Sequence, residues 1–594
     1  MFGAIGRGDL VSLSQVALGR IERPTALVCI VGEFKQGKSS LVNELVGLQV
    51  CPVDDDLATS VLTLVHHAER PVVRVHRRSE DTVDVHEVSP DEMAEWVTER
   101  GNAGNQRTVE RVEVGVSSRF LERGPALIDT PGSGGLSAGA AAAVLAFLPF
   151  ADAMVFVTDA SSELSATEID YLRQSAARCP CVLMCLTKTD IYPEWRRIRA
   201  LNVQHLHTAG LEIPIFPVSS TLRGLALQRS DRSLNDESGF PALLQGLDRQ
   251  ILSRVKQAAA SRAIAEVCEA AASSAASLRA ELAVLDDPAR LADTLAQLES
   301  ARAQLEVLKG PAARWSVLLN DRVTDLGNEV NHLFRTGVRS VLRDADEAFE
   351  KASSQDEWKA LVASSQQQLA LLVGEVFRRI DDAHSTTRAE IAGLLRDDVG
   401  VPSITAAGAV DFGALWLGVG SAAQAADRDR ASVGDSVDRS LNLVRGAYGA
   451  TAMFGILARL LPATAAAMLL SNPFTLGAGT ILGVRHAREQ RRRRTAAQRQ
   501  QARASFRSTV EQIQTEVAKA IGDAIRDVQR ALRDDFTARI QELQRVNVEV
   551  ATRCQEDVNR DATWRQDRRG RIVEGIDSLD RLAHRAAALE ETGT

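Results

Sequence analysis

The sequence has 594 residues, of which 4% are aromatic, and its formal net charge is -8. A chain of this length exceeds one hydrophobic core, so we expect several domains, or a globular domain with a long extended element. The low aromatic content favours long helices over sheets, and the acidic balance gives no general reason to expect nucleic acid as a partner.

The first segment, residues 1–24, is predicted to be an N-terminal helix that joins a helical neck. It reads MFGAIGRGDLVSLSQVALGRIERP and lacks the basic start and the apolar core of a signal peptide. Export is therefore not expected.

Residues 25–251 alternate short apolar runs with helical stretches. The strand candidates are ALVCIVG, RVEVGV, ALIDTPG, AMVFVTDA, CVLMCLTKTD and PIFPVSS. This alternation is typical of an α/β domain in which helices flank a mostly parallel sheet. Several of the seven cysteines lie in these runs, so we expect reduced thiols rather than disulfides or a metal site.

A phosphate-binding loop of the pattern G-x-x-x-x-G-K-S spans residues 32–39, between the first strand and a helix-like run. Glycines permit the tight turn, and backbone amides at the helix N-terminus cradle phosphates. Lys38 would reach the β- and γ-phosphates, and Ser39 would bind Mg²⁺. The residues expected to line the phosphates are Gly32, Lys35, Gln36, Gly37, Lys38, Ser39 and Ser40.

Two further segments complete the predicted Mg²⁺ site. In DTPG, at residues 129–132, Asp129 would hold Mg²⁺ through water, and Gly132 would offer its amide to the γ-phosphate. In DDDLATSVLT we assign Thr59 as the first switch threonine, whose hydroxyl would join Ser39 on the metal. The competing hydroxyls in that run are Ser60 and Thr63.

The segment TKTD, at residues 187–190, indicates guanine as the base. Asp190 would accept hydrogen bonds from the N1–H and 2-amino groups of guanine, a donor pair that adenine lacks. The stem of Lys188 would lie along the base, and Thr187 belongs to the same motif. Ser219 and Ser220, at the end of the next strand, are expected to complete the pocket.

The chemistry expected at this site is hydrolysis without a covalent nucleophile. No Cys/His or Ser/His/Asp arrangement competes, and the histidines, including His66 and His67, are interpreted as surface or packing residues. Positioning and charge neutralisation around an attacking water would supply the catalysis. The side chains assigned to this step are Lys38, Ser39, Thr59 and Gln36.

Beyond residue 252 the pattern becomes helical. We predict a neck and trunk in residues 252–430, where apolar residues recur at helical spacing, and returning helices in residues 501–594. From residue 506 to residue 543 apolar side chains step by three or four, which predicts one long, nearly straight amphipathic helix. Such a stripe must pack on the earlier helices, so an elongated bundle outside the globular head is expected.

Residues 431–500 are interpreted as an apolar tip with a basic flank. Pro462 and Pro473 argue against a membrane-spanning helix, so a broken hairpin that enters one leaflet fits better, with arginines attracted to anionic lipids. The alternatives are a buried hairpin with a solvated arginine face, or nucleic-acid binding, which lacks interleaved aromatics. The candidate membrane residues are Phe454, Leu457, Leu469, Leu470, Phe474, Leu476, Arg491, Arg492, Arg493 and Arg494.

The combination of GEFKQGKSSLVNELVG, a switch threonine, DTPG, TKTD and long helices broken by an apolar tip resembles the bacterial dynamin-like proteins. Segments such as TKTDIYPEW and SNPFTLGAGTILG look most like a mycobacterial member. The resemblance implies a GTPase head with GTP and Mg²⁺, a helical neck and trunk, and a lipid-binding tip. It further implies nucleotide-dependent head dimerisation that drives membrane fission or fusion.

The resemblance also implies partners and a location. The partners are anionic lipids, a second copy of the chain and a second dynamin-like protein, and the location is the cytoplasmic face of the cell membrane.

One position departs from eukaryotic dynamins, which carry a catalytic glutamine where this chain has Phe34, although bacterial relatives often have an apolar residue there. Gln36 and Lys35 are the candidates to orient water instead. Two other functions stay open: a soluble regulatory GTPase whose helical arm binds a protein, and a scaffold that binds nucleotide without turnover.

Overall fold

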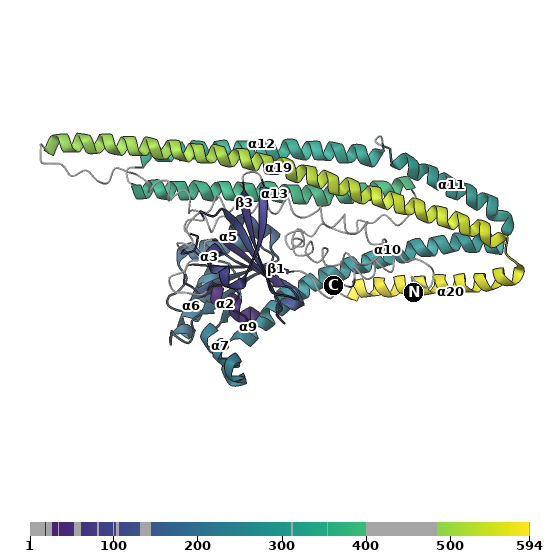
Figure 1. Cartoon of the computed structure of the whole chain (residues 1–594), viewed down its shortest axis with the longest axis horizontal. Helices are drawn as coiled ribbons and strands as arrows, with labels where there is room; N and C mark the ends of the chain where they lie inside the picture. The colour runs from purple at the N-terminus through teal and green to yellow at the C-terminus, as the bar shows by residue number, and fades with distance from the viewer. Residues whose placement is uncertain are drawn as a thin grey trace.

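The structure is a computed structural model. It describes residue 18 and residues 26–33, 35–52, 61–79, 82–98, 100–102, 106–130, 144–310, 313–352, 355–399 and 484–592. In these residues an α/β head is joined to an elongated set of long helices (Figure 1). The predicted N-terminal helix, apart from Leu18, and the apolar run at residues 446–483 lie outside the described residues.

The described part of the head contains one nine-stranded sheet, with the strand order β4-β3-β5-β2-β6-β1-β7-β8-β9. Strands β6, β1, β7, β8 and β9 are parallel, whereas β2 is antiparallel to β6 and β3 is antiparallel to both of its neighbours. The strands are β1 (Ala26–Gly32), β2 (Leu62–His67), β3 (Val72–Ser79), β4 (Thr82–Val88), β5 (Val109–Val116), β6 (Pro125–Asp129), β7 (Ala153–Asp159), β8 (Val182–Thr187) and β9 (Ile215–Pro217).

The central strands have continuous apolar sequences because both faces of the sheet are covered. In β1, Leu27 and Cys29 face one hydrophobic core, and Val28 and Ile30 face the other. The head helices are α2 (Lys38–Val46), α3 (Ala94–Val97), α5 (Ala166–Ala176), α6 (Trp195–Thr208), α7 (Ser220–Arg229), α8 (Arg232–Glu237) and α9 (Phe240–Leu247). Shorter helical turns are η2 (Pro90–Glu92), η4 (Leu121–Arg123), η5 (Leu148–Phe150), η6 (Asp248–Leu252) and η7 (Pro288–Arg290).

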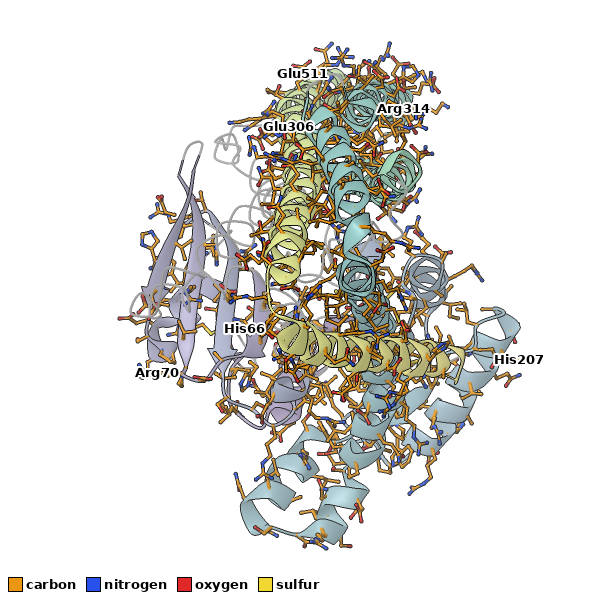
Figure 2. The ribbon with its side chains drawn as sticks, turned by 90° about the vertical axis from the view of Figure 1, so that its right-hand side faces the viewer. His66, Arg70, His207, Glu306, Arg314 and Glu511 are labelled. Atoms are coloured by element: carbon orange, nitrogen blue, oxygen red, sulfur yellow. The ribbon has the colours of Figure 1, made fainter. Side chains whose placement is uncertain are left out.

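The six strands expected from the sequence are present, and β2, β3 and β4 were not anticipated. Their sequences place histidine, arginine and acidic residues among the apolar ones, which obscures the apolar run of a buried strand. Two of these histidines pack inside the sheet, where His66 and His76 approach the buried carboxylate of Glu113 at 3.5 and 3.2 Å. His66 is labelled in Figure 2 on the head sheet. The interpretation of His66 as a packing residue agrees with this environment.

Long helices form the remainder of the described chain. They are α10 (Ser253–Asp286), α11 (Leu291–Leu308), α12 (Arg314–Lys351), α13 (Gln355–Val399), α19 (Val484–Val558) and α20 (Ala562–Thr592). Helices α12, α13 and α19 run side by side as a trunk, while α10 and α20 pair as a neck that leads away from the head (Figure 1). Figure 2 views the trunk end-on, with the exposed residues Arg314 and Glu511 at its surface and the exposed Glu306 on α11.

The predicted apolar stripe on α19 is confirmed. Its side chains from Phe506 to Ile540 are buried at the spacing of three and four residues, in one core with α12 and α13. Aromatic pairs mark both ends of the α12 contact: the ring centroids of Trp315 and Phe536 are 6.1 Å apart, and those of Phe349 and Phe506 are 6.0 Å apart. Burial of this stripe holds the two halves of the trunk together.

Part of the arginine cluster belongs to the trunk. Arg503 and Arg507 on α19 donate to the two carboxylate oxygens of Asp346 on α12, at 2.6 and 2.7 Å. Helix α19 runs from Val484 through residue 500, where the sequence suggested a domain boundary, because arginine, glutamine and alanine are good helix formers. Among the described residues, no helix combines the length and the apolar character needed to cross a bilayer.

The head also contacts the trunk directly. A Cβ added to Gly374 on α13 would lie 2.7 Å from the carbonyl oxygen of Ala146 and 2.8 Å from its Cα. Ala146 precedes η5, in a segment that begins soon after the DTPG motif. Backbone approaches backbone here, so glycine is required at residue 374 for the head and trunk to meet as they do.

Candidate nucleotide-binding site

The phosphate-binding loop connects β1 to α2, and its two glycines are required for different reasons. A Cβ on Gly32 would lie 2.1 Å from the carbonyl oxygen of Val157, so glycine lets β1 and β7 approach closely. Gly37 adopts φ 91° at the N-cap of α2, a left-handed conformation that glycine adopts without steric cost. The exposed Lys35 also has a positive φ of 63°, and Ser40 lies in the first turn of α2.

Lys38 places its ammonium inside the loop. Its Nζ donates to the carbonyl oxygens of Gly32 and Glu33 at 2.9 and 2.7 Å, and the side chain is buried. Burial lowers the pKa of Lys38, and the negative charges of Asp129 and Glu33 act in the opposite direction. The Nζ of Lys38 lies inside a loop whose shape suits phosphate.

Ser39 and Asp129, predicted to share one metal ion, lie together. The Ser39 hydroxyl donates to Oδ2 of Asp129 at 2.7 Å. Asp129 is 1% exposed, and burial raises its pKa, an effect that Lys38 and the Ser39 hydrogen bond partly offset. Its other oxygen, Oδ1, is buried without an N–H or O–H donor among the described residues. A hydroxyl beside a buried carboxylate is a donor set that fits Mg²⁺.

Thr63, one of the competing switch residues, lies beside this carboxylate. It is paired with Asp129 between β2 and β6, and its hydroxyl is buried without a partner among the described residues. Thr59, Ser60 and Gly132 lie outside the described residues, so Thr59 as the switch threonine stays a prediction. Thr63 is the hydroxyl of that run that the structure brings to the site.

The TKTD motif reaches the same edge of the sheet because β8 runs parallel to β7 and ends at Thr187. The Thr187 hydroxyl donates to the carbonyl oxygen of Gln36 at 2.7 Å, which joins the motif to the phosphate-binding loop. Lys188 turns the chain with φ 56°, and Asp190 lies exposed in the turn that follows. An exposed carboxylate in this position can accept hydrogen bonds from a base.

Ser219 and Ser220 lie near this turn, since the amide of Thr189 donates to the carbonyl oxygen of Val218 at 3.5 Å. The Ser219 hydroxyl caps helix α7 by accepting from the amide of Leu222 at 3.0 Å. Ser220 is the first residue of that helix. The cap gives Ser219 a structural role, and contact of either serine with the base stays a prediction.

The catalytic candidates near Phe34 are placed only in part. The Gln36 side-chain oxygen accepts from the amide of Asp159 at 2.6 Å, so this carboxamide ties the loop to β7. Its role in orienting water stays a prediction, and Phe34 lies outside the described residues. The membrane candidates Phe454, Leu457, Leu469, Leu470, Phe474 and Leu476 also lie outside the described residues, and for Arg491, Arg492, Arg493 and Arg494 the structure describes the α19 backbone alone.

Sequence reasoning missed two residues that organise the site. Asn43, inside α2, donates to the side chain of Gln49 at 2.9 Å and to the carbonyl oxygen of Cys51 at 2.8 Å. Its own side-chain oxygen accepts from the amides of Val50 and Cys51, which fixes the segment that leads to the first switch. Asp159 ends β7 beside TKTD. Its place as the last residue of the strand AMVFVTD was the available signal.

These features define the class of protein: a P-loop nucleotide-binding protein whose α/β head carries a helical neck and trunk. A model of the Dynamin family matches residues 28–186. The isoniazid-induced protein IniA of Mycobacterium tuberculosis is 33% identical over 597 aligned residues, which cover 99% of this chain and 91% of IniA. The chain belongs to the dynamin family and is a bacterial dynamin-like protein, as its motifs indicated.

Two further similarities are weaker. The isoniazid-induced protein IniC of the same organism is 28% identical over 179 residues, which cover 28% of this chain and 34% of IniC. A solved structure of an oligomerised bacterial dynamin pair, described as a mechanism for the long-range sensing and tethering of membranes, has a TM-score of 0.42 and 14% identity. That match covers 99% of this chain and 80% of the solved chain.

Proposed function

We propose that this chain binds GTP with Mg²⁺, hydrolyses GTP to GDP and phosphate, and uses that reaction to remodel membranes by fission or fusion. The observation that carries the proposal is the meeting of Lys38, Ser39 and Asp129 around the phosphate-binding loop, with the TKTD turn hydrogen-bonded to that loop. Membership of the dynamin family supports the guanine nucleotide.

Each residue has a role in this proposal. The Lys38 ammonium would exchange the carbonyl oxygens that it now contacts for oxygens of the β- and γ-phosphates. Ser39 and Asp129 would hold Mg²⁺, which supplies charge neutralisation at the phosphates when bound. Asp190 would select guanine by accepting from its N1–H and 2-amino groups. The fixed positions of these groups lower the reorganisation that the reaction requires.

The membrane part of the proposal is supported by the placement of α19. Its first residues, which include arginines 491–494 of the sequence, lie at the end of the trunk that is farthest from the junction with the neck (Figure 1). An apolar segment that precedes this end would enter one leaflet, and the arginines would attract anionic lipids. We further propose that the protein acts on the cytoplasmic face of the cell membrane, with a second copy bound through the heads or with a second dynamin-like protein.

The first test is GTP hydrolysis by the full chain and by Lys38→Ala. Loss of a charge at the centre of the phosphate site is expected to lower kcat/KM by about 100-fold or more. Lys309→Ala, which removes an exposed lysine at the end of α11, is the matched control and should turn over like the wild type. Binding of GTP by the wild type without turnover would favour a nucleotide-binding scaffold and overturn the hydrolysis proposal.

The second test is sedimentation with liposomes that contain anionic lipid. The wild type is expected to pellet, and polar substitution of Phe454, Leu469, Leu470 and Phe474 together should abolish pelleting. Equal pelleting of this variant would show that another surface binds lipid. No pelleting of the intact protein would favour the alternative function, a soluble regulatory GTPase whose helical arm binds a protein partner.

A further inference from the structure

Asp159 connects the two halves of the nucleotide site. Its carboxylate oxygen Oδ2 accepts from Nζ of Lys188 at 2.9 Å, and its Oδ1 accepts from the amide of Ser161 at 3.0 Å and from the Ser161 hydroxyl. Its own amide donates to the side-chain oxygen of Gln36 in the phosphate-binding loop at 2.6 Å. One residue thus touches both the loop that would hold phosphates and the lysine that would lie along the base.

The pairing of β7 with β8 brings these groups together. Asp159 and Thr187 are register partners at the carboxyl ends of the two parallel strands, and Lys188 follows directly. Lys188 has φ 56°, a left-handed conformation that is uncommon for residues other than glycine and has an energetic cost. The residues around Lys188 must maintain this backbone conformation. The ion pair with Asp159 fixes the position of the Lys188 side chain.

The ion pair lies in a partly enclosed place. The side chains of Asp159 and Lys188 are 10% and 29% exposed, so water screens their attraction less than it would at an open surface. Burial alone would raise the pKa of Asp159, but the hydrogen bonds from Ser161 and Lys188 outweigh burial and lower the pKa. The carboxylate is therefore charged at neutral pH.

We propose that Asp159 is a positioning residue for guanine-nucleotide binding, which holds the Lys188 ammonium so that the stem of Lys188 is in place along the purine ring. This inference rests on the proposed function. Contact with the face of a purine does not depend on the ring substituents, whereas Asp190 reads the N1–H and 2-amino groups. Asp159 should thus govern affinity for purine diphosphates in general, and Asp190 should govern the choice among them.

The experiment is calorimetric titration of the full chain with GDP and with inosine diphosphate, which lacks the 2-amino group. Asp159→Ala is expected to raise the Kd for both nucleotides by about fivefold to tenfold, the effect of losing one partly enclosed ion pair. The ratio of the two Kd values should stay constant in this variant. Asp190→Asn should change the ratio instead. Ser161→Ala, which keeps the ion pair, is the matched control and should raise the Kd less.

A double-mutant cycle separates positioning from general support of the fold. If Asp159 acts through Lys188, then Asp159→Ala combined with Lys188→Ala should raise the Kd no further than Lys188→Ala alone. Additive losses would overturn the inference. Should Asp159→Ala fail to fold, Asp159→Asn, which keeps the size of the side chain and removes its charge, takes its place in the cycle.

The outcomes also separate this inference from the proposed function. A wild type that binds neither nucleotide would overturn the proposed function, and the inference with it. A wild type that binds GDP, with an Asp159→Ala variant that binds equally well, would overturn the inference alone.

Discussion

Glu281, at the junction between neck and trunk, should make the stability of the protein depend on pH. This residue near the end of α10 is 2% exposed, and its carboxylate accepts from Nε of Arg568 on α20 at 2.7 Å. Burial raises the pKa of Glu281 to about 7, helped by a hydrogen bond with Asp557 of α19 and opposed by Arg568. Burial raises the pKa of Cys554, also on α19, and the negative charge of Glu281 raises it further.

The sign of the effect follows from proton binding. The ordinary pKa of the carboxyl group, 4.5, applies to the unfolded chain, so between pH 4.5 and about 7 the folded state binds more protons. The stability that Glu281 contributes is full below pH 4.5 and is lost as the pH rises through about 7. The difference between these pKa values corresponds to about 3 kcal/mol over the whole range.

The test is Glu281→Gln, a variant that keeps the shape of the side chain and cannot ionise. Between about pH 5.5 and about pH 8 the wild type should lose about 2 kcal/mol more free energy of unfolding than the variant does. Urea denaturation followed by the helical circular dichroism signal measures this, because the junction consists of α10, α19 and α20. Glu329→Gln, which removes an exposed carboxylate paired with Arg379, should keep the pH dependence of the wild type. Equal pH dependence in wild type and Glu281→Gln would refute the reasoning.

Three other predictions concern packing. Gly32→Ala should lower the melting temperature of the head, because its Cβ would lie 2.1 Å from the carbonyl oxygen of Val157; an unchanged thermal transition would contradict this. Gly374→Ala should separate head from trunk and raise the radius of gyration measured by X-ray scattering, whereas Gly393→Ala, on the same helix with open space around it, should leave the radius unchanged. Phe536→Ala should reduce the free energy of unfolding of the trunk by about 3–5 kcal/mol, measured by urea denaturation, and a loss below about 1 kcal/mol would show that the stripe packs loosely.

The sequence by itself determined the features that depend on neighbouring residues along the chain. The loop at residues 32–39, the carboxylate of Asp129 and the TKTD turn each follow an apolar strand, and parallel strands bring their carboxyl ends to one edge of the sheet. The spacing of apolar residues likewise determined α19, because a helix presents one stripe every three or four residues. Strands β3 and β4 escaped prediction because charged residues interrupt their apolar pattern, and the apolar run of β2 is short and ends in two histidines.

The tertiary structure alone decided how distant surfaces meet. The sequence assigned Arg503 and Arg507 no partner, and packing of α19 against α12 gives them Asp346. Pairing of β7 with β8 joins Asp159 to Lys188, and the close approach of α13 to the head explains Gly374. Periodicity and motifs indicate which kind of surface one segment must pack against or bind. They do not specify which of several compatible surfaces will satisfy that requirement, because that choice depends on the packing of the whole chain.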